Sequence, residues 1–346
     1  MKNEMRSLYL TSPEVLEVRT NSIPSPLPHE VLIRLRSVGI CGSDLHYFID
    51  GRIGDQRILN PHILGHEAVG EIAETGAKVS WLKKGDRVAV EPAIPCGKCE
   101  LCLHGKPNLC QSVVFLGTPP VSGAFQEYLV MPGENCLLIP EELGFDEAVL
   151  AEPLAIALYG VRHASFSIGD TSAIFGGGPI GLSVLFTLLS AGSSQTILTE
   201  LVPSRATMAS TLGANLVLMA QETDSVKEIL SVTDGKGVDV AYECAGSQET
   251  LTQAIESVCC GGKVVIFGIP SGDDVKVDPH LIRRKEVTIY NVRRSAFTTP
   301  VALAMIKQSP LFQRLITHRF PLDRAAEGFQ LLSGYKDGVI KAVVHP

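Results

Sequence analysis

The sequence of 346 residues is poor in charge and has no excess of basic side chains. Charged residues make up 19% of the chain and its formal net charge is −7, whereas proteins that bind the phosphate backbone of nucleic acids are normally basic. Hydrophobic residues make up 45%, which is enough for a sizeable core and does not fit a disordered chain. The composition therefore favours a globular protein without a nucleic-acid partner. At roughly 150 residues per domain, the length predicts two domains.

Long hydrophobic runs are also absent. The most apolar stretch with a helical pattern, residues 180–191, is too short to cross a bilayer and suits a buried helix, so we expect no membrane partner. The first ten residues, MKNEMRSLYL, contain no run of signal-peptide length, which predicts a cytoplasmic location. Cysteines in that compartment stay reduced, and nine of them cannot all pair. The sequence thus predicts no disulfide framework.

Four of the cysteines lie in the stretch PCGKCELCLHGKPNLC, residues 95–110, with the spacing C-x2-C-x2-C-x7-C. A bacterial ferredoxin run closes with a shorter interval and a proline, which excludes that kind of iron–sulfur site. Gly97, Gly105 and Pro107 supply turns that let four thiolates reach one tetrahedral zinc ion. We therefore predict a closed structural zinc site, the alternative being four unrelated buried cysteines. Its ligands would be Cys96, Cys99, Cys102 and Cys110.

Residues 170–266 alternate apolar strands with helical segments, which is the rhythm of a parallel doubly wound sheet. The first strand, TSAIFG, runs directly into GGGPIG, a G-x-G-x-x-G motif that opens a helix. The motif alone is weak because glycine-rich turns are common, but here strand, glycines, helix and second strand follow in order. Such glycines let the backbone approach a pyrophosphate, which the helix N-terminus attracts. The predicted dinucleotide site comprises Gly176, Gly178, Pro179, Ile180 and Gly181.

Glu200 stands at the end of the second strand of this pattern, 24 residues after Gly176. A carboxylate at that place accepts hydrogen bonds from ribose hydroxyls and repels the 2′-phosphate of NADP. Arg205, five residues further on, could instead accept a phosphate, but we expect the acid to dominate. The predicted cofactor is therefore NAD.

A second set of metal-binding side chains is spread over the first half of the chain. Cys41 begins the stretch CGSDLHY, His66 and Glu67 end ILGHE, and Glu152 lies in AEPLA. A catalytic zinc takes about three protein ligands and keeps one position open. Cys41, His66 and a carboxylate from Glu67 or Glu152 satisfy that count, although each residue alone is more often a core or hydrogen-bonded side chain. Whether either carboxylate binds directly or through water stays open.

Taken in order, CGSDLHY, ILGHE, the four-cysteine stretch, AEPLA and FGGGPIGL resemble the zinc-containing medium-chain dehydrogenases. The stretches HYFIDGRIGD, FLGTPP and THRFPL resemble their polyol branch, the sorbitol and xylitol dehydrogenases. The resemblance covers essentially the whole chain. It implies an enzyme that oxidises a secondary hydroxyl of a polyol to a ketone and transfers the hydride to NAD. It also implies one catalytic and one structural zinc per chain and a homotetramer.

The resemblance assigns roles residue by residue. Cys41 and His66 match the family's zinc ligands, Glu67 matches an acid at or near the metal, and Asp44 matches the acid that orients the zinc-binding histidine. Glu152 stands where simple alcohol dehydrogenases carry a second cysteine ligand. The proton relay is matched by Ser43 and His46. The substrate pocket is matched by Tyr47, Phe115, Thr118 and Arg294, the last also lying near the cofactor.

The implied fold is of the α/β class, an NAD-binding Rossmann domain with a doubly wound parallel sheet inserted in a GroES-like β-barrel catalytic domain. We expect the catalytic domain at 1–152, with the zinc lobe at 95–111, the nucleotide domain at 153–293 and the return at 294–346. Two positions depart from the family: Glu200 replaces a commoner aspartate, and Ser295 stands where several members have tyrosine. The alternatives are a related dehydrogenase for L-idonate, L-threonine or a simple secondary alcohol, and a non-enzymatic zinc-binding structural or nucleic-acid-binding protein.

Overall fold

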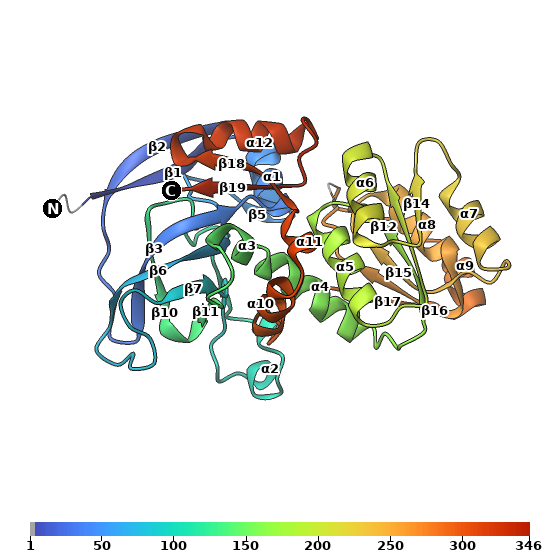
Figure 1. Cartoon of the computed structure of the whole chain (residues 1–346), viewed down its shortest axis with the longest axis horizontal. Helices are drawn as coiled ribbons and strands as arrows, with labels where there is room; N and C mark the ends of the chain where they lie inside the picture. Colours follow the sequence, from blue (N-terminus) through green and yellow to red (C-terminus); the bar gives the residue numbers. More distant parts are fainter. Residues whose placement is uncertain (1–3, 271) are drawn as a thin grey trace. The chain divides into compact units, whose positions relative to one another are not determined.

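The computed structural model describes residues 4–270 and 272–346, which fold into two compact units (Figure 1). The first unit contains the chain up to Glu152 and again from Thr299, and the second contains residues 153–298. The return to the first unit therefore lies at 299, where 294 was expected. The reason is local: the hydroxyl of Thr298 donates to the carbonyl of Ala155 in the second unit (2.7 Å), while the hydroxyl of Thr299 donates to Glu91 in the first (2.5 Å).

The first unit is built on a seven-stranded sheet. Its order is β11-β7-β6-β3-β19-β18, with β10 pairing with β3, and all pairs are antiparallel except β18 with β19. The strands are β3 (Glu30–Gly39), β6 (Glu67–Thr75), β7 (Arg87–Val90), β10 (Tyr128–Pro132), β11 (Cys136–Leu138), β18 (Ile316–Pro321) and β19 (Lys341–His345). β3 is buried over most of its length, so it forms the centre of the core. The last strand of the chain, β19, pairs directly with it.

Smaller elements complete this unit. Three two-stranded sheets are formed by β1 (Glu4–Ser12) with β2 (Val15–Ser22), β4 (Arg52–Ile53) with β5 (Gln56–Arg57), and β8 (Ala93–Ile94) with β9 (Val114–Phe115). The helices are α1 (Gly42–Asp50), α2 (Glu100–Leu103), α3 (Phe145–Val149), α10 (Thr299–Lys307), α11 (Pro310–Gln313) and α12 (Ala325–Ser333), with 3-10 turns at Pro107–Leu109, Gly133–Asn135 and Leu322–Arg324. The ring of Phe48 on α1 packs against Phe329 on α12, with centroids 5.1 Å apart. This contact fixes α1, which carries several predicted site residues.

The second unit has an entirely parallel six-stranded sheet in the order β14-β13-β12-β15-β16-β17. The strands are β12 (Thr171–Phe175), β13 (Gln195–Glu200), β14 (Leu216–Met219), β15 (Val238–Glu243), β16 (Val258–Ile266) and β17 (Thr288–Asn291). The helices are α4 (Ala151–His163), which enters from the first unit, α5 (Pro179–Ser190), α6 (Pro203–Leu212), α7 (Ser225–Val232), α8 (Gln248–Ser257) and α9 (Pro279–Lys285). The strand order reverses at β12, so right-handed crossovers place helices on both faces.

The fold class predicted from the sequence is confirmed: a Rossmann-type unit is inserted in a barrel-like unit (Figure 1). β12 and β13 are buried on both faces because helices cover both sides of the sheet. Nucleotides bind such sheets at the carboxyl ends of the strands beside the point of reversal, which here is the end of β12. Among the described residues no helix has the length and apolar character needed to cross a membrane.

Candidate metal and cofactor sites

The predicted catalytic metal centre starts where β3 ends. Cys41 is the N-cap of α1 and has an extended backbone. The Asp44 carboxylate accepts a hydrogen bond from the Cys41 backbone N–H (2.9 Å) and another from the Gly65 backbone N–H (3.1 Å). One buried acid therefore ties the start of α1 to the segment just before His66.

His66 and Glu67 reach the same place from the start of β6. The ligand atoms of Cys41, His66 and Glu67 all lie within 4.8 Å of one another, and both His66 and Glu67 are buried. The His66 Nδ1 lies 3.7 Å from the Asp44 carboxylate. Burial lowers the pKa of His66, but Asp44 and the Cys41 thiolate outweigh it and hold that pKa well above its ordinary value. The imidazole thus lies in a strongly negative surrounding, which a divalent cation would balance.

Glu152 lies in the first turn of α4 and is outside that close group of three. Its side chain is only 8% exposed, and its Oε2 has no hydrogen-bond partner among the described residues. Burial raises the pKa of Glu152 to about 8; Glu67 and Glu91 add to the effect, while His66 and Lys341 oppose it. A buried carboxylate oxygen without a partner is costly unless a ligand completes it. Glu152 therefore fits a place at or near a bound cation.

Lys341 is the residue that sequence reasoning missed. It begins β19, is 1% exposed, and its ammonium contacts the Glu67 carboxylate and donates to the carbonyl of Ile40 (3.0 Å). Burial lowers the pKa of Lys341, but Glu67 and Cys41 reverse the effect and raise it. The signal was present in the sequence, because a lysine inside the apolar run VIKAVV is a charge in a buried strand.

Three of the predicted relay and pocket residues lie on α1, and a fourth, Phe115, lies on β9. Ser43 and His46 are on the first turns of α1, and the His46 Nδ1 lies 3.9 Å from the Asp50 carboxylate. Tyr47, on the same helix, is buried with its hydroxyl 3.5 Å from the Gln56 side-chain oxygen. The Phe115 ring lies 5.5 Å from the His66 ring. Of these four residues, the contacts described here place Phe115 beside His66, and the relay and pocket roles stay predictions.

The remaining pocket residues are placed separately. Thr118 follows Phe115 by three residues, and its backbone N–H donates to the Phe115 carbonyl (3.2 Å). Arg294 and the buried Ser295 belong to the second unit. Arg294 has a positive φ of 59°, a backbone conformation that is uncommon outside glycine. The pocket that would combine Tyr47, Phe115 and Arg294 stays a prediction.

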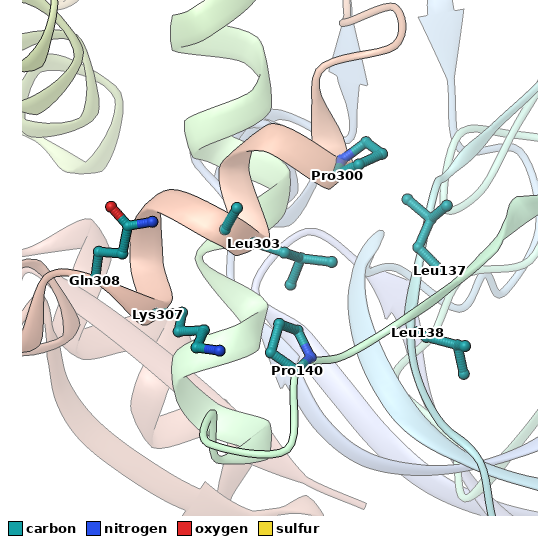
Figure 2. Close-up of a pocket in the computed structure, with 8 residues that line it drawn as sticks. Leu137, Leu138, Pro140, Pro300, Leu303, Lys307 and Gln308 are labelled. Atoms are coloured by element: carbon teal, nitrogen blue, oxygen red, sulfur yellow. The ribbon is translucent and has the colours of Figure 1, made fainter.

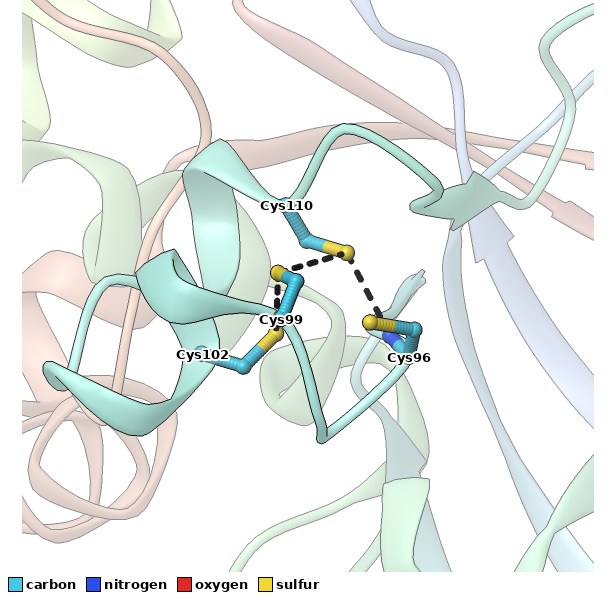
Figure 3. Close-up of side chains that lie close together, drawn as sticks. All are labelled: Cys96, Cys99, Cys102 and Cys110. Atoms are coloured by element: carbon cyan, nitrogen blue, oxygen red, sulfur yellow. Dashed lines mark hydrogen bonds between the residues drawn. The ribbon is translucent and has the colours of Figure 1, made fainter.

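The four-cysteine lobe is assembled as its spacing predicts. All four sulfurs lie within 4.8 Å of one another, with Cys99 3.5 Å from Cys102 and 3.8 Å from Cys110 (Figure 3). Gly97 and Gly105 have positive φ angles, 69° and 73°, at the turns between ligands. The Lys98 and Cys99 backbone N–H groups lower the pKa of Cys96 to about 6. A tetrahedral thiolate site for zinc fits these residues, and no electron-transfer or catalytic group lies among them.

The nucleotide motif lies at the carboxyl end of β12. Gly176 has a φ of 101°, and a Cβ on Gly181 would lie 1.8 Å from the Gly176 carbonyl oxygen. Gly178 is the N-cap of α5 and Pro179 and Ile180 form its first turn. Only glycine at 181 allows the helix to start this close to the turn. The backbone is therefore shaped for the close approach of a pyrophosphate.

Glu200 contacts this turn directly. Its carboxylate accepts a hydrogen bond from the Gly177 N–H (2.6 Å) through one oxygen, and from the N–H groups of Leu201 (2.6 Å) and Val202 (2.8 Å) through the other. The buried Arg205 also reaches the turn, with its guanidinium 3.8 Å from where a Cβ on Gly178 would stand. A role for Glu200 in shaping the glycine turn was not foreseen from the sequence.

A separate pocket of about 420 Å³ lies between β11 and α10 and contains none of the predicted site residues (Figure 2). Its lining is mostly apolar, and its one ammonium, that of Lys307, is paired with Glu142 (2.6 Å). No metal-binding or proton-transferring group lines it, so this pocket offers no chemistry of its own.

Comparison with known proteins identifies the family of the chain. Residues 27–141 match the alcohol dehydrogenase GroES-like domain, and residues 179–308 match the zinc-binding dehydrogenase domain. Sorbitol dehydrogenase of Bacillus subtilis is 38% identical over 99% of this chain and 97% of its own length. The fold is similar to that of 2R,3R-butanediol dehydrogenase from Bacillus subtilis, with 34% identity, a TM-score of 0.87 and 99% of both chains covered. It is also similar to a zinc-binding dehydrogenase from Sinorhizobium meliloti bound to NADP, with 31% identity, a TM-score of 0.90 and all of both chains covered.

The sequence motifs, the two assembled sets of metal-binding side chains and these similarities agree. The chain therefore belongs to the zinc-containing medium-chain dehydrogenases, in their polyol branch.

Proposed function

We propose that the protein oxidises a secondary hydroxyl of a polyol to a ketone and transfers the hydride to NAD. The observation that carries the proposal is the meeting of Cys41, His66 and Glu67 in one buried place, with the unpartnered Glu152 oxygen as a further donor. A thiol, an imidazole and carboxylates form a donor set that suits zinc with an open position. When bound, zinc supplies a Lewis acid for the hydroxyl, and NAD supplies the hydride acceptor.

The residues of the chain have distinct tasks around that centre. Asp44 orients His66, because its carboxylate is itself held by the N–H groups of Cys41 and Gly65. Ser43 and His46, both on α1, would carry the proton of the substrate hydroxyl away from the metal centre. His66 and Glu152 are themselves buried, which would limit the access of bulk water to a hydroxyl bound beside them.

The preference for NAD follows from Glu200. Its carboxylate lies at the glycine turn and uses three of its lone pairs on backbone N–H groups, so one remains for a ribose hydroxyl. A 2′-phosphate would meet the same negative charge. Arg205 lies close enough to contact the turn, and it supports the competing proposal of NADP, which is bound in the structure of the Sinorhizobium protein.

A polyol is proposed as substrate because the site is harder and more polar than a dithiolate site. Glu152 replaces a second thiolate, and oxygen donors suit a metal that must hold hydroxyl groups and water. Tyr47 and Thr118 add hydroxyls to the predicted pocket. A short vicinal diol is the second candidate. It is supported by the similarity to butanediol dehydrogenase and by the Phe115 ring beside His66, which narrows the space.

A substrate panel read by NADH absorbance tests the proposal. We expect kcat/KM for sorbitol and xylitol to exceed that for ethanol and 2-butanol by up to roughly 10^4, because a pocket with buried polar groups rejects analogues that leave them unpaired. L-Threonine, L-idonate and 2,3-butanediol belong in the same panel. A preference for 2-butanol over both polyols contradicts the proposal, and a preference for 2,3-butanediol favours the second candidate.

The homotetramer, which family resemblance supports, and the cytoplasmic location, which the first ten residues support, also stay proposals. Light scattering on the purified protein decides the first, since a monomer of 37.1 kDa is easily distinguished from four.

A further inference from the structure

His62 is a buried histidine outside both sets of metal-binding side chains described above. It is only 7% exposed. Its backbone N–H donates to the Leu10 carbonyl (3.0 Å), and its own carbonyl accepts from the Leu10 N–H (2.8 Å). These two bonds tie His62 to β1, so its side chain starts from a fixed point in the first unit.

The imidazole of His62 reaches across to the backbone of Gly117. Its Nε2 lies 3.3 Å from the Gly117 carbonyl oxygen, and this contact is buried. Burial lowers the pKa of His62, and the Gly117 carbonyl and Asp44 oppose this only in part, so the imidazole is neutral near pH 7. Because a carbonyl oxygen can only accept, the neutral ring carries its proton on Nε2 and donates it to Gly117.

Gly117 is the third residue of a tight turn, residues 115–118, in which the Thr118 N–H donates to the Phe115 carbonyl (3.2 Å). Its φ is 76°, which glycine adopts without strain at this position of a turn. A Cβ on Gly117 would lie 2.8 Å from the Gly65 carbonyl oxygen. The turn is therefore packed against the residue that precedes His66, and the hydrogen bond from His62 holds it there.

The first residue of this turn borders the predicted metal centre, because the Phe115 ring lies 5.5 Å from the His66 ring. Without the imidazole of His62, the buried Gly117 carbonyl would have to find another donor. The turn would then shift, and Phe115 would move with it. The hydrogen bond between His62 and Gly117 thus controls a side chain that His62 itself is not recorded to touch.

We propose that His62 is a positioning residue for substrate specificity: through Gly117 it holds Phe115 beside His66. This keeps the space beside His66 narrow and favours unbranched substrates over bulky ones. The inference rests on the proposed function, because it assumes that a substrate hydroxyl binds beside His66.

Inhibition by cyclohexanol, a bulky secondary alcohol, tests the inference in a set of variants. His62→Leu removes the donor at similar volume, whereas the amide of His62→Gln still reaches the Gly117 carbonyl. Phe115→Ala and the double variant His62→Leu/Phe115→Ala complete the set. The matched control is His29→Leu, at an exposed histidine of the same unit. For each protein we measure kcat and KM for the best linear substrate of the panel, the inhibition constant of cyclohexanol, the zinc content and the melting temperature.

We expect His62→Leu to lower the inhibition constant of cyclohexanol, relative to KM for the linear substrate, on the order of tenfold. The value of kcat and the zinc content should change little, and the melting temperature should fall because the Gly117 carbonyl is left unpaired. His62→Gln should restore the wild-type ratio. Phe115→Ala should shift the ratio in the same direction, and the double variant should add nothing to it, because His62 acts through Phe115.

If His62→Leu fails to fold, His62→Asn gives the same test, because its shorter amide does not reach Gly117. An unchanged ratio in these variants, effects of His62→Leu and Phe115→Ala that multiply in the double variant, or a loss of zinc from His62→Leu rejects the inference and leaves the proposed function intact. A wild-type protein that forms no NADH with any substrate of the panel rejects the proposed function, and the inference falls with it.

Discussion

Replacing Glu200 by glutamine removes the negative charge at the glycine turn and keeps the size of the side chain. If the 2′-phosphate of NADP binds about 5 Å from this carboxylate, the repulsion per unit charge is about 3 kcal/mol at an effective dielectric constant of about 20. This corresponds to a factor of about 100 in relative affinity. We therefore expect Glu200→Gln to lower the ratio of kcat/KM for NAD over NADP by about 100-fold.

The same substitution should also destabilise the second unit. In the wild type the two carboxylate oxygens serve three backbone N–H groups, those of Gly177, Leu201 and Val202. Glutamine has one acceptor oxygen, so at least one buried N–H group would face its amide and lose its partner, at a cost of about 1–3 kcal/mol. The melting temperature should fall by roughly 2–4 °C for each of those kcal/mol.

The assay is steady-state NADH and NADPH formation, combined with thermal unfolding. Asp234→Asn is the matched control: Asp234 is exposed, precedes the amino end of β15, whereas the glycine turn follows the carboxyl end of β12, and has a φ of 52° that asparagine tolerates. The control makes the same change in net charge and should alter neither the cofactor ratio nor the melting temperature. Equal kcat/KM for the two cofactors in the wild type, or an unchanged ratio in Glu200→Gln, would refute the reasoning.

The other predictions concern the metal sites and the nucleotide turn. Cys99→Ser should lower the melting temperature and remove about one zinc per chain, because a closed thiolate site contributes folding energy, whereas Cys260→Ser, at an exposed cysteine, should change neither. Cys41→Ser should keep the wild-type melting temperature within a few degrees and abolish turnover. Elemental analysis that finds no zinc in the wild type would contradict both. Gly181→Ala should weaken NAD binding more than tenfold, because its Cβ would lie 1.8 Å from the Gly176 carbonyl oxygen. Calorimetry that shows unchanged NAD binding would reject this prediction. The control is Gly272→Ala, whose Cβ meets nothing nearer than 3.8 Å.

Local features of the sequence were sufficient for the Rossmann unit and the cysteine lobe. The order of strand, glycine motif, helix and strand from 171 to 200 needs only neighbouring residues, and the structure has β12, α5 and β13 there. The four cysteines span 15 residues, so short turns alone bring their sulfurs together. In both cases the residues that interact are close to one another in the chain, so the pattern of residue types is enough to predict the local structure.

The meeting of Cys41, His66 and Glu67 was expected from resemblance to a family, since their spacing alone is a weak signal. In the structure the meeting results from the antiparallel pairing of β3 with β6, which sets Gly39 opposite Glu67. The sequence shows which residues of each strand are apolar, but it does not show which strands pair or in which register. That choice depends on the packing of the whole sheet.

Lys341 illustrates what only the tertiary structure decided. It lies 274 residues after Glu67, and the chain passes through the entire second unit in between. The register of β19 against β3, with Val343 opposite Gly39, places the Lys341 ammonium beside Ile40 and Glu67. The sequence by itself shows that a lysine interrupts the apolar run VIKAVV, but its place beside Glu67 was not predicted. Its partner, Glu67, was decided by the pairing of strands that are far apart in the chain. Local residue preferences do not predict such pairing, because its free energy comes from contacts that form only when the whole unit folds.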